Sequence, residues 1–197
     1  MRNLLILLYV SLLIPSVARD KVYGDSWAII VGINEYEDEK LKDLNYAISD
    51  AESIRSMLTT RYGFSESKID FLVDEDATRA NIMSALDALS TKTEKNDRVL
   101  FFFAGHGETK RNPSGGEAGY LIPVDGNKDR LYSSCIAMKD LDEISDMYKA
   151  KHMLFLVDAC YSGLAAMATR GGLDTSVPGY IDKITKDDSR IVITAGS

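Results

Sequence analysis

The stretch Val99-Leu100-Phe101-Phe102-Phe103-Ala104-Gly105-His106-Gly107 decides how this chain folds. Its apolar run is bounded by turn residues, which is typical of a strand that is buried on both faces of a sheet. The run ends in Gly-His-Gly, and glycine lets the backbone bend and lets other groups approach closely. We therefore predict a central strand that delivers His106 to one edge of the sheet.

A second stretch has the same design, His152-Met153-Leu154-Phe155-Leu156-Val157-Asp158-Ala159-Cys160 followed by Tyr161-Ser162-Gly163. Here a cysteine stands where the first stretch has its histidine. If the two strands are parallel neighbours, their carboxyl ends meet at one edge of the sheet, where ligand sites of open parallel sheets lie. The sequence therefore predicts that imidazole and thiol come together there.

The segments around these strands alternate between strand and helix patterns. Ala47, Ala51, Ile54 and Leu58 have helical spacing, and Gly63 is a typical helix end. Thr78 is a plausible N-cap of the next helix. Such alternation predicts a parallel sheet with helices on both faces, and right-handed crossovers restrict its topology. The expected strands are 27–33, 69–73, 99–104, 152–160 and 190–194, and the expected helices are 44–62, 139–150 and 180–185, with a further helix after Thr78 that buries Ile82, Leu86 and Leu89.

Three connecting segments have their own signals. Glu108 to Glu117 is polar, with Asn-Pro-Ser-Gly-Gly at its tip, and we expect an exposed, mobile loop. Tyr120 to Pro123 is a short extended piece that Pro123 should confine to an edge of a sheet. Residues 161–179 also have loop composition.

The first residues have the features of a secretory signal peptide. Arg2 precedes an apolar segment from Leu4 to Ile14, and Ser16 and Ala18 supply small residues for cleavage after Ala18. We expect a signal peptide at 1–18, a linker at 19–25, a single domain at 26–197, and a secreted or periplasmic protein. The alternative is an uncleaved membrane anchor.

Charge and composition restrict the partners. The 197 residues carry a formal net charge of −7, and no basic cluster stands out, which argues against nucleic acid and anionic membranes. Hydrophobic residues make up 45% of the chain, which is ordinary for a globular domain. With two histidines, of which His152 lies at the opposite end of its strand, we expect no metal site and no cofactor.

A histidine beside a cysteine suits nucleophilic catalysis. The imidazole can accept the thiol proton, and the thiolate is the competent nucleophile. The backbone N–H groups of Gly107 and Cys160 could point at the oxyanion of a tetrahedral intermediate. Cys135 is expected to be a small buried or loop residue, although it could instead pair with Cys160 in an exported protein, which would block the nucleophile.

These motifs resemble the caspase-like cysteine peptidases, especially their metacaspase-type and bacterial members. In caspases, too, a histidine precedes the cysteine by about fifty residues. The similarity covers nearly all of residues 26–197. It rests on Gly-Ile-Asn-x-Tyr at 32–36, Leu44–Leu58 with Asp50-Ala51, Tyr120–Asp125 and Arg190–Ser197.

The resemblance implies a fold and a set of roles. The fold would be an α/β three-layer sandwich around a mainly parallel sheet of order 2-1-3-4-5. Cys160 would be the nucleophile and His106 the general base and acid. Asp50 and Asp158 match the two pocket carboxylates of metacaspases, which would select Arg or Lys before the cut bond of a peptide or protein substrate.

Some features depart from the family pattern. The stretch 136–140 keeps little of the acidic cluster of calcium-dependent metacaspases, so we expect no strong calcium site. Ala104 replaces a serine that some metacaspases have. Family domains continue past the strand at 190–196, so we expect that C-terminal elements are missing. Two alternatives to a peptidase stay open, a catalytically inactive binding or regulatory domain, and a cysteine hydrolase or transferase that acts on something other than peptides.

Overall fold

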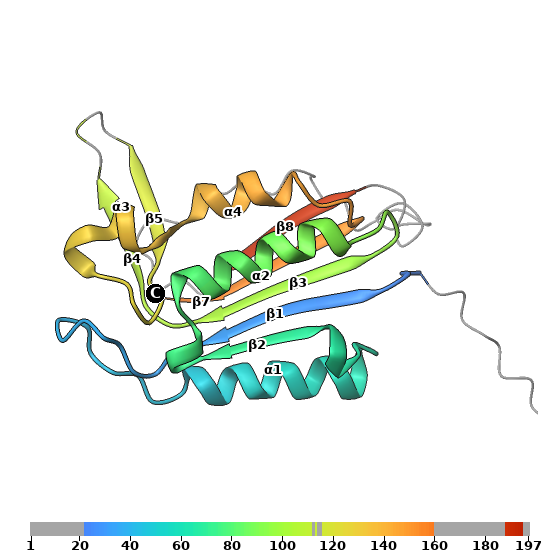
Figure 1. Ribbon diagram of the computed structural model, residues 1–197, viewed down its shortest axis with the longest axis horizontal. Coiled ribbons are helices and arrows are strands. Elements are labelled where there is room, and N and C mark those ends of the chain that lie inside the picture. Colours follow the sequence, from blue (N-terminus) through green and yellow to red (C-terminus); the bar gives the residue numbers. More distant parts are fainter. Residues whose placement is uncertain (1–21, 112, 114–115, 160–187, 195–197) are drawn as a thin grey trace, which may run out of the picture.

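A five-stranded parallel sheet forms the centre of the computed structural model, which describes residues 22–111, 113, 116–159 and 188–194 (Figure 1). Its strand order is β2-β1-β3-β7-β8, which confirms the order expected from the sequence. Helices lie on both faces, so the predicted α/β three-layer architecture is also confirmed. The strands are β1 (Ser26–Gly32), β2 (Ile69–Val73), β3 (Arg98–Ala104), β7 (His152–Asp158) and β8 (Ser189–Thr194).

The apolar run that ends at His106 forms the central strand β3. It pairs with β1 on one side and with β7 on the other. Phe101 and Phe103 belong to the core on one face of the sheet, and Leu100 and Phe102 belong to the core on the other. A strand covered on both faces needs apolar residues at every position, which explains why the run is continuous.

Helix α1 (Ala47–Arg61) covers one face of the sheet through Ala47, Ala51 and Leu58. It begins three residues later than expected, and Leu44 lies in the preceding loop, where its N–H donates to the carbonyl of Asn34. Its end is confirmed, because Gly63 has a φ of 72° and leaves the helix in the left-handed region.

Helices α2 (Arg79–Lys92) and α4 (Met138–Ser145) cover the other face. The predicted N-cap of α2 is confirmed, since the Thr78 hydroxyl accepts the Asn81 N–H at 3.1 Å. Helix α4 is shorter than expected. Beyond its end the chain continues in tight turns, which are closed by hydrogen bonds from the N–H groups of Met147 and Tyr148. The Tyr148 hydroxyl donates to the Leu86 carbonyl in α2.

A small antiparallel sheet of order β4-β5-β6 follows the histidine. Its strands are β4 (Gly107–Arg111), β5 (Glu117–Leu121) and β6 (Ile136–Ala137). The prediction of a loop at 108–117 is therefore wrong for residues 108–111 and Glu117, which pair in a β-hairpin. The edge prediction for 120–123 is also wrong, because β5 is the central strand and Pro123 lies beyond its end, where its missing N–H costs no ladder bond.

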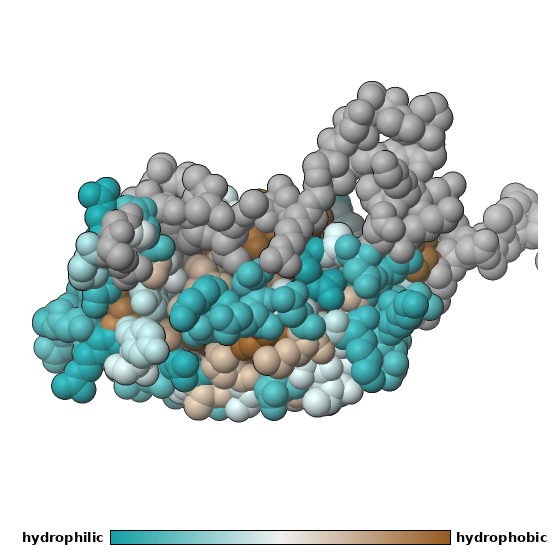
Figure 2. Space-filling model, turned by 90° about the horizontal axis from the view of Figure 1, so that it is seen from above, coloured by the Kyte–Doolittle hydropathy of each residue, from teal (hydrophilic) through white to brown (hydrophobic). Residues whose placement is uncertain are grey.

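The polar composition of this hairpin reflects its exposure rather than a lack of structure. Arg111 and Glu117 form an ion pair of 2.8 Å across it, where the two strands are still paired. The hairpin projects from the sheet in Figure 1, and the corresponding end of the molecule in Figure 2 is mostly hydrophilic. Charged residues on an edge strand also discourage unwanted pairing with other chains.

The longest irregular segment that the structure describes lies at the carboxyl ends of the strands of the central sheet. The loop 33–46, the small sheet and the helix α3 (Leu131–Ser134) all lie at this end (Figure 1). Three short 3₁₀ helices complete the described elements, η1 (Glu66–Lys68), η2 (Asp74–Asp76) and η3 (Lys128–Arg130).

Some predictions fall on residues outside the described ranges. These are the signal peptide at 1–18, Cys160, the loop at 161–179 and the helix at 180–185. Within the described part of the chain, no helix combines the length and the apolar character needed to cross a membrane.

Candidate active site

His106 lies directly beyond the carboxyl end of β3, beside the end of β7. The register pairs Ala104 with Asp158, and the Gly105 N–H donates to the Asp158 carbonyl at 3.2 Å. The prediction that these two strands are parallel neighbours is therefore confirmed. Cys160 follows Ala159 in the sequence and lies outside the described residues, so the contact between thiol and imidazole stays a prediction.

The backbone of His106 is fixed on both sides. Its N–H donates to the hydroxyl of Tyr36 at 2.7 Å, and its carbonyl accepts the N–H of Ile122 at 3.0 Å. The Tyr36 and His106 rings also lie 4.9 Å apart between centroids, with a tilt of 42°. These contacts come from the loop 33–46 and from the end of β5, so two segments that are distant in the sequence hold one residue.

The imidazole of His106 has a defined partner as well. Its Nε2 lies 2.7 Å from the backbone carbonyl of Lys42. A carbonyl oxygen only accepts hydrogen bonds, so Nε2 carries the proton. In the neutral imidazole, Nδ1 then holds the lone pair that can accept a proton. This is the form that a general base requires.

Gly105 is needed because other atoms come close to it. A Cβ at this position would lie 2.7 Å from the Tyr36 hydroxyl oxygen and 3.0 Å from the ring of Phe103, which is fully buried. The first distance is shorter than real Cβ atoms show and the second is very tight, so any larger residue would displace a neighbour. The first glycine of Gly-His-Gly therefore makes room for the Tyr36 contact.

Tyr36 is a site residue to which the sequence assigned no role. Burial raises the pKa of its hydroxyl, which therefore stays protonated throughout the physiological range. The available signal was its place in Gly-Ile-Asn-x-Tyr directly after β1, where a ring can reach the end of the neighbouring strand β3.

Asp74 and Asn34 hold the loop 33–46 at its two ends. The Asp74 carboxylate accepts the N–H groups of Asn34 at 2.7 Å and Glu35 at 3.2 Å. The Asn34 side chain in turn accepts the N–H of Ile48 in the first turn of α1 at 3.4 Å. Asp74 has a φ of 40°, which is uncommon for a residue with a side chain and often accompanies functional sites.

The two predicted pocket carboxylates lie on the same side of the sheet. Asp158 is the last residue of β7, and its side chain is exposed. Because side chains alternate along a strand, Asp158 shares a face with Leu154 and Leu156, which pack on the α1 side of the sheet. Asp50 lies half-buried in the first turn of α1. A shared pocket formed by these two residues stays a prediction.

The approach of α1 to the sheet brings its first turn near this edge. A Cβ on Gly32 would lie only 2.7 Å from the Ala47 carbonyl oxygen. Gly32 pairs with Ala104, which pairs with Asp158, so all three lie in one row across the sheet. The side chains that separate α1 from Asp158 along this row are small.

A family model for the caspase domain matches residues 25–193. The chain belongs to the caspase domain family. The resemblance to metacaspase-type domains is thereby confirmed, and curated relatives agree with it. The chain is 31% identical to Metacaspase-2 of Arabidopsis thaliana over 154 residues, which are 72% of this chain and 35% of that protein. It is 30% identical to a probable protease of a Desulfuromonadales bacterium, over 68% of this chain and 18% of the relative.

Solved structures share the fold of this caspase domain. One is a Geobacter sulfurreducens protein with a TM-score of 0.59 and 23% identity, covering 71% of this chain and 52% of that one. Another is pro-sf-caspase-1, with a TM-score of 0.51 and 16% identity, covering 87% of this chain and 60% of that one. The chain spans about a third or less of the length of the two curated relatives.

The remaining site predictions fall on backbone and cysteine groups of the caspase domain. Gly107 begins β4 and pairs with Leu121, and the donor role expected of its N–H stays a prediction. Cys135 is buried with a free thiol, as expected for a structural residue. Burial raises the pKa of that thiol. No group of three or more His, Cys, Asp and Glu within the described ranges has the arrangement of a metal site.

Proposed function

We propose that this caspase domain belongs to a cysteine endopeptidase that hydrolyses peptide bonds through His106 and Cys160. The observation that carries the proposal is the state of His106 at the end of β3. Its Nε2 is engaged by the Lys42 carbonyl, and the neighbouring strand β7 leads into the cysteine. Family membership supports the same activity.

The reaction follows from these groups. The sulfur of Cys160 attacks the carbonyl carbon of the scissile bond while Nδ1 of His106 takes the thiol proton. The N–H groups of Gly107 and Cys160 donate to the resulting oxyanion. His106 then passes the proton to the leaving amine, and water, deprotonated by the same imidazole, releases the acyl group and restores the thiol.

Specificity for Arg or Lys rests on two carboxylates. Asp50 and Asp158 lie on the α1 side of the sheet, close to its carboxyl edge. A cationic side chain placed there would gain charge-assisted hydrogen bonds, and guanidinium could make them with two oxygens at once. The formal net charge of −7 favours a cationic substrate further.

The central experiment compares turnover of fluorogenic peptides that end in Arg, Lys or Asp by wild type and by Cys160→Ala. We expect cleavage of the Arg and Lys peptides and a loss of at least about a thousandfold in the variant. Cys135→Ala removes the other thiol and serves as the matched control. Equal turnover by wild type and Cys160→Ala would overturn the mechanism.

The same preparation separates the alternatives. A hydrolase that acts on other substrates would react at Cys160 with a thiol-directed probe and cleave no peptide in the panel. An inactive binding domain would do neither. Both outcomes contradict the proposed activity.

Asp50→Asn and Asp158→Asn test the specificity. Each should lower kcat/KM for Arg peptides by about tenfold or more, since a charge-assisted hydrogen bond is lost. Glu52→Gln, an exposed carboxylate on the same helix, is the control. Preferred cleavage after Asp would contradict the assignment.

We also propose that the protein is exported, on the basis of the apolar segment before Ala18. Mass spectrometry of the protein from culture fluid or periplasm should find a first residue of Arg19. Retention of residues 1–18 on membrane-associated protein would support the anchor instead.

A further inference from the structure

The loop 33–46 carries the carbonyl that engages His106, so its position matters for the site. Asp74 fixes the start of the loop, and the Asn34 side chain joins that start to the first turn of α1, which follows the end of the loop. Lys42 itself lies in neither a helix nor a strand. Its carbonyl can serve His106 only if the middle of the loop is also held in place.

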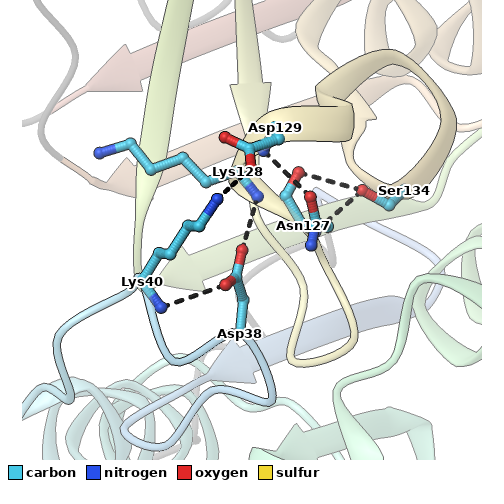
Figure 3. A network of polar contacts seen from close by, with 6 residues as sticks. All are labelled: Asp38, Lys40, Asn127, Lys128, Asp129 and Ser134. Carbon is cyan, nitrogen blue, oxygen red and sulfur yellow. Dashed lines mark hydrogen bonds and ion pairs between the residues drawn. The ribbon is translucent and has the colours of Figure 1, made fainter.

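Asp38 makes the side-chain connections in the middle of the loop, beside a backbone bond from the Glu37 N–H to the Val124 carbonyl at 3.0 Å. One carboxylate oxygen accepts the N–H of Lys40 at 3.1 Å, and the other accepts the N–H of Lys128 at 2.9 Å (Figure 3). The Asp38 carbonyl also accepts the N–H of Leu41 at 2.8 Å, which closes a turn directly before Lys42. One residue thus shapes the loop and joins it to a segment ninety positions further along the chain.

The segment that Asp38 joins is itself well held. The Asn127 side chain accepts the N–H of Asp129 at 3.0 Å, and the Ser134 hydroxyl accepts the N–H of Asn127 at 2.9 Å (Figure 3). Lys128 also forms an ion pair of 3.4 Å with Glu108 of β4, the strand that begins directly after His106. Asp38 therefore ties the loop to a firm support close to the site.

A second contact also joins the loop to this segment, but it contributes less to holding the loop in place. Lys40 forms an ion pair with Asp129, and their side chains are 63% and 65% exposed. Ion pairs this exposed add little, because water and salt screen them and both side chains lose freedom. The bonds of Asp38 differ because they reach backbone N–H groups, which have fixed directions. These bonds also lower the pKa of Asp38, so the carboxylate is charged at neutral pH.

We propose that Asp38 is a positioning residue, whose carboxylate holds the loop so that the Lys42 carbonyl keeps the proton of His106 on Nε2. The inference rests on the proposed function, because it assigns to Asp38 the task of keeping His106 in the tautomer that acts as the base in that reaction. The hydrogen bonds of Asp38 run to Lys40, Leu41 and Lys128 rather than to the imidazole, so it acts through the Lys42 carbonyl.

Nitrogen NMR of ¹⁵N-histidine-labelled protein tests this directly, because the chain has only two histidines. His152 is an internal control at the opposite end of the sheet, where its Nδ1 lies 2.7 Å from the Tyr23 hydroxyl. Spectra are recorded at about pH 8.5, above the usual range of histidine titration. We expect His106 of wild type to show the Nε2–H tautomer.

Asp38→Asn replaces one acceptor oxygen by an NH₂ group that cannot accept a backbone N–H. We expect a mixture of tautomers at His106, an unchanged His152 signal, and a melting temperature within about 3 °C of wild type. For peptide cleavage, kcat should fall by about tenfold to a hundredfold with KM within about twofold, as for a misplaced catalytic group. Glu39→Gln, the neighbouring exposed carboxylate, should behave as wild type.

The tautomer measurement does not depend on peptidase activity, so the two proposals can fail separately. If wild type cleaves no peptide but Asp38→Asn alters the His106 tautomer, the proposed function fails and the positioning role stands. A wild-type tautomer in Asp38→Asn, or an Nδ1–H tautomer at His106 of wild type, would overturn the role of Asp38.

Discussion

The hydroxyl of Tyr36 and the backbone N–H of His106 meet at 2.7 Å, although seventy positions separate the two residues in the chain. Tyr36→Phe keeps the ring contact and removes this acceptor. We expect a loss of about 1–3 kcal/mol in the free energy of unfolding, because a part-buried donor loses its partner. Peptide cleavage should also weaken. Urea denaturation and kcat measure the two effects.

Tyr132→Phe is the matched control, since Tyr132 is 78% exposed and its hydroxyl should be dispensable. If both variants unfold at the same urea concentration, the Tyr36 hydroxyl does not support His106.

Gly105→Ala should disturb the same contact from the other side. The new methyl group would lie 2.7 Å from the Tyr36 hydroxyl oxygen and 3.0 Å from the Phe103 ring. Overpacking of this kind costs about 1–3 kcal/mol and here would displace Tyr36. We expect reduced stability and a larger loss of turnover. In the Tyr36→Phe background the cost of the alanine should shrink, because the closest clashing atom is gone.

Asp97 is expected to matter most for stability at the opposite end of the sheet. Its buried carboxylate accepts N–H groups from Asp25 at 2.7 Å, Glu94 at 2.9 Å and the Trp27 indole at 3.0 Å. Asp97→Asn should lower the free energy of unfolding by about 2–4 kcal/mol. Glu143→Gln, an exposed carboxylate, should leave it unchanged.

The stability of wild type should also depend on pH through Asp97. Burial alone would raise its pKa, but the N–H donors and the charge of Lys68 outweigh burial and lower it. The stabilisation is therefore complete above the unfolded-state pKa of about 3.9 and is lost as pH falls through the lower folded value. Urea titrations from about pH 6 to pH 3 should show wild type losing its advantage over Asp97→Asn.

Cys135 should be inert in the native protein. It is buried, and burial raises the pKa of its thiol, so little thiolate is available for reaction. Brief treatment with iodoacetamide followed by peptide mass mapping should find Cys160 modified and Cys135 unmodified. In denaturant both should react. An adduct on native Cys135, or a disulfide between the two cysteines, would contradict this expectation.

The sequence predicted the central sheet because burial on both faces leaves an unambiguous pattern. The apolar run with Phe101 to Phe103 is bounded by turn residues, Asn96-Asp97 before it and Gly105 after it, and this pattern predicted the strand. The order of strands came from the resemblance rather than from any local signal. His106 was found because it ends such a strand.

Other parts of the site had no local signal. The contact between Tyr36 and His106 depends on the register of β1 and β3, which no single segment encodes. The hairpin after His106 was missed because its exposed strands carry charged residues, which also suit a loop. The φ of 40° at Asp74 accompanies hydrogen bonds to its carboxylate from Asn34 and Glu35, which lie in another part of the chain.

Because Ala104 pairs with Asp158, the lengths of β3 and β7 determine where the two residues of the proposed dyad lie relative to each other. His106 and Cys160 each stand two positions beyond this pair in the sequence. Because side chains alternate along a strand, one inserted residue in β3 would turn His106 to the opposite face, away from Lys42. An insertion of two would restore the face but advance the imidazole by about 6–7 Å. Length variation in this domain should therefore be tolerated in the hairpin tip and forbidden within the two strands.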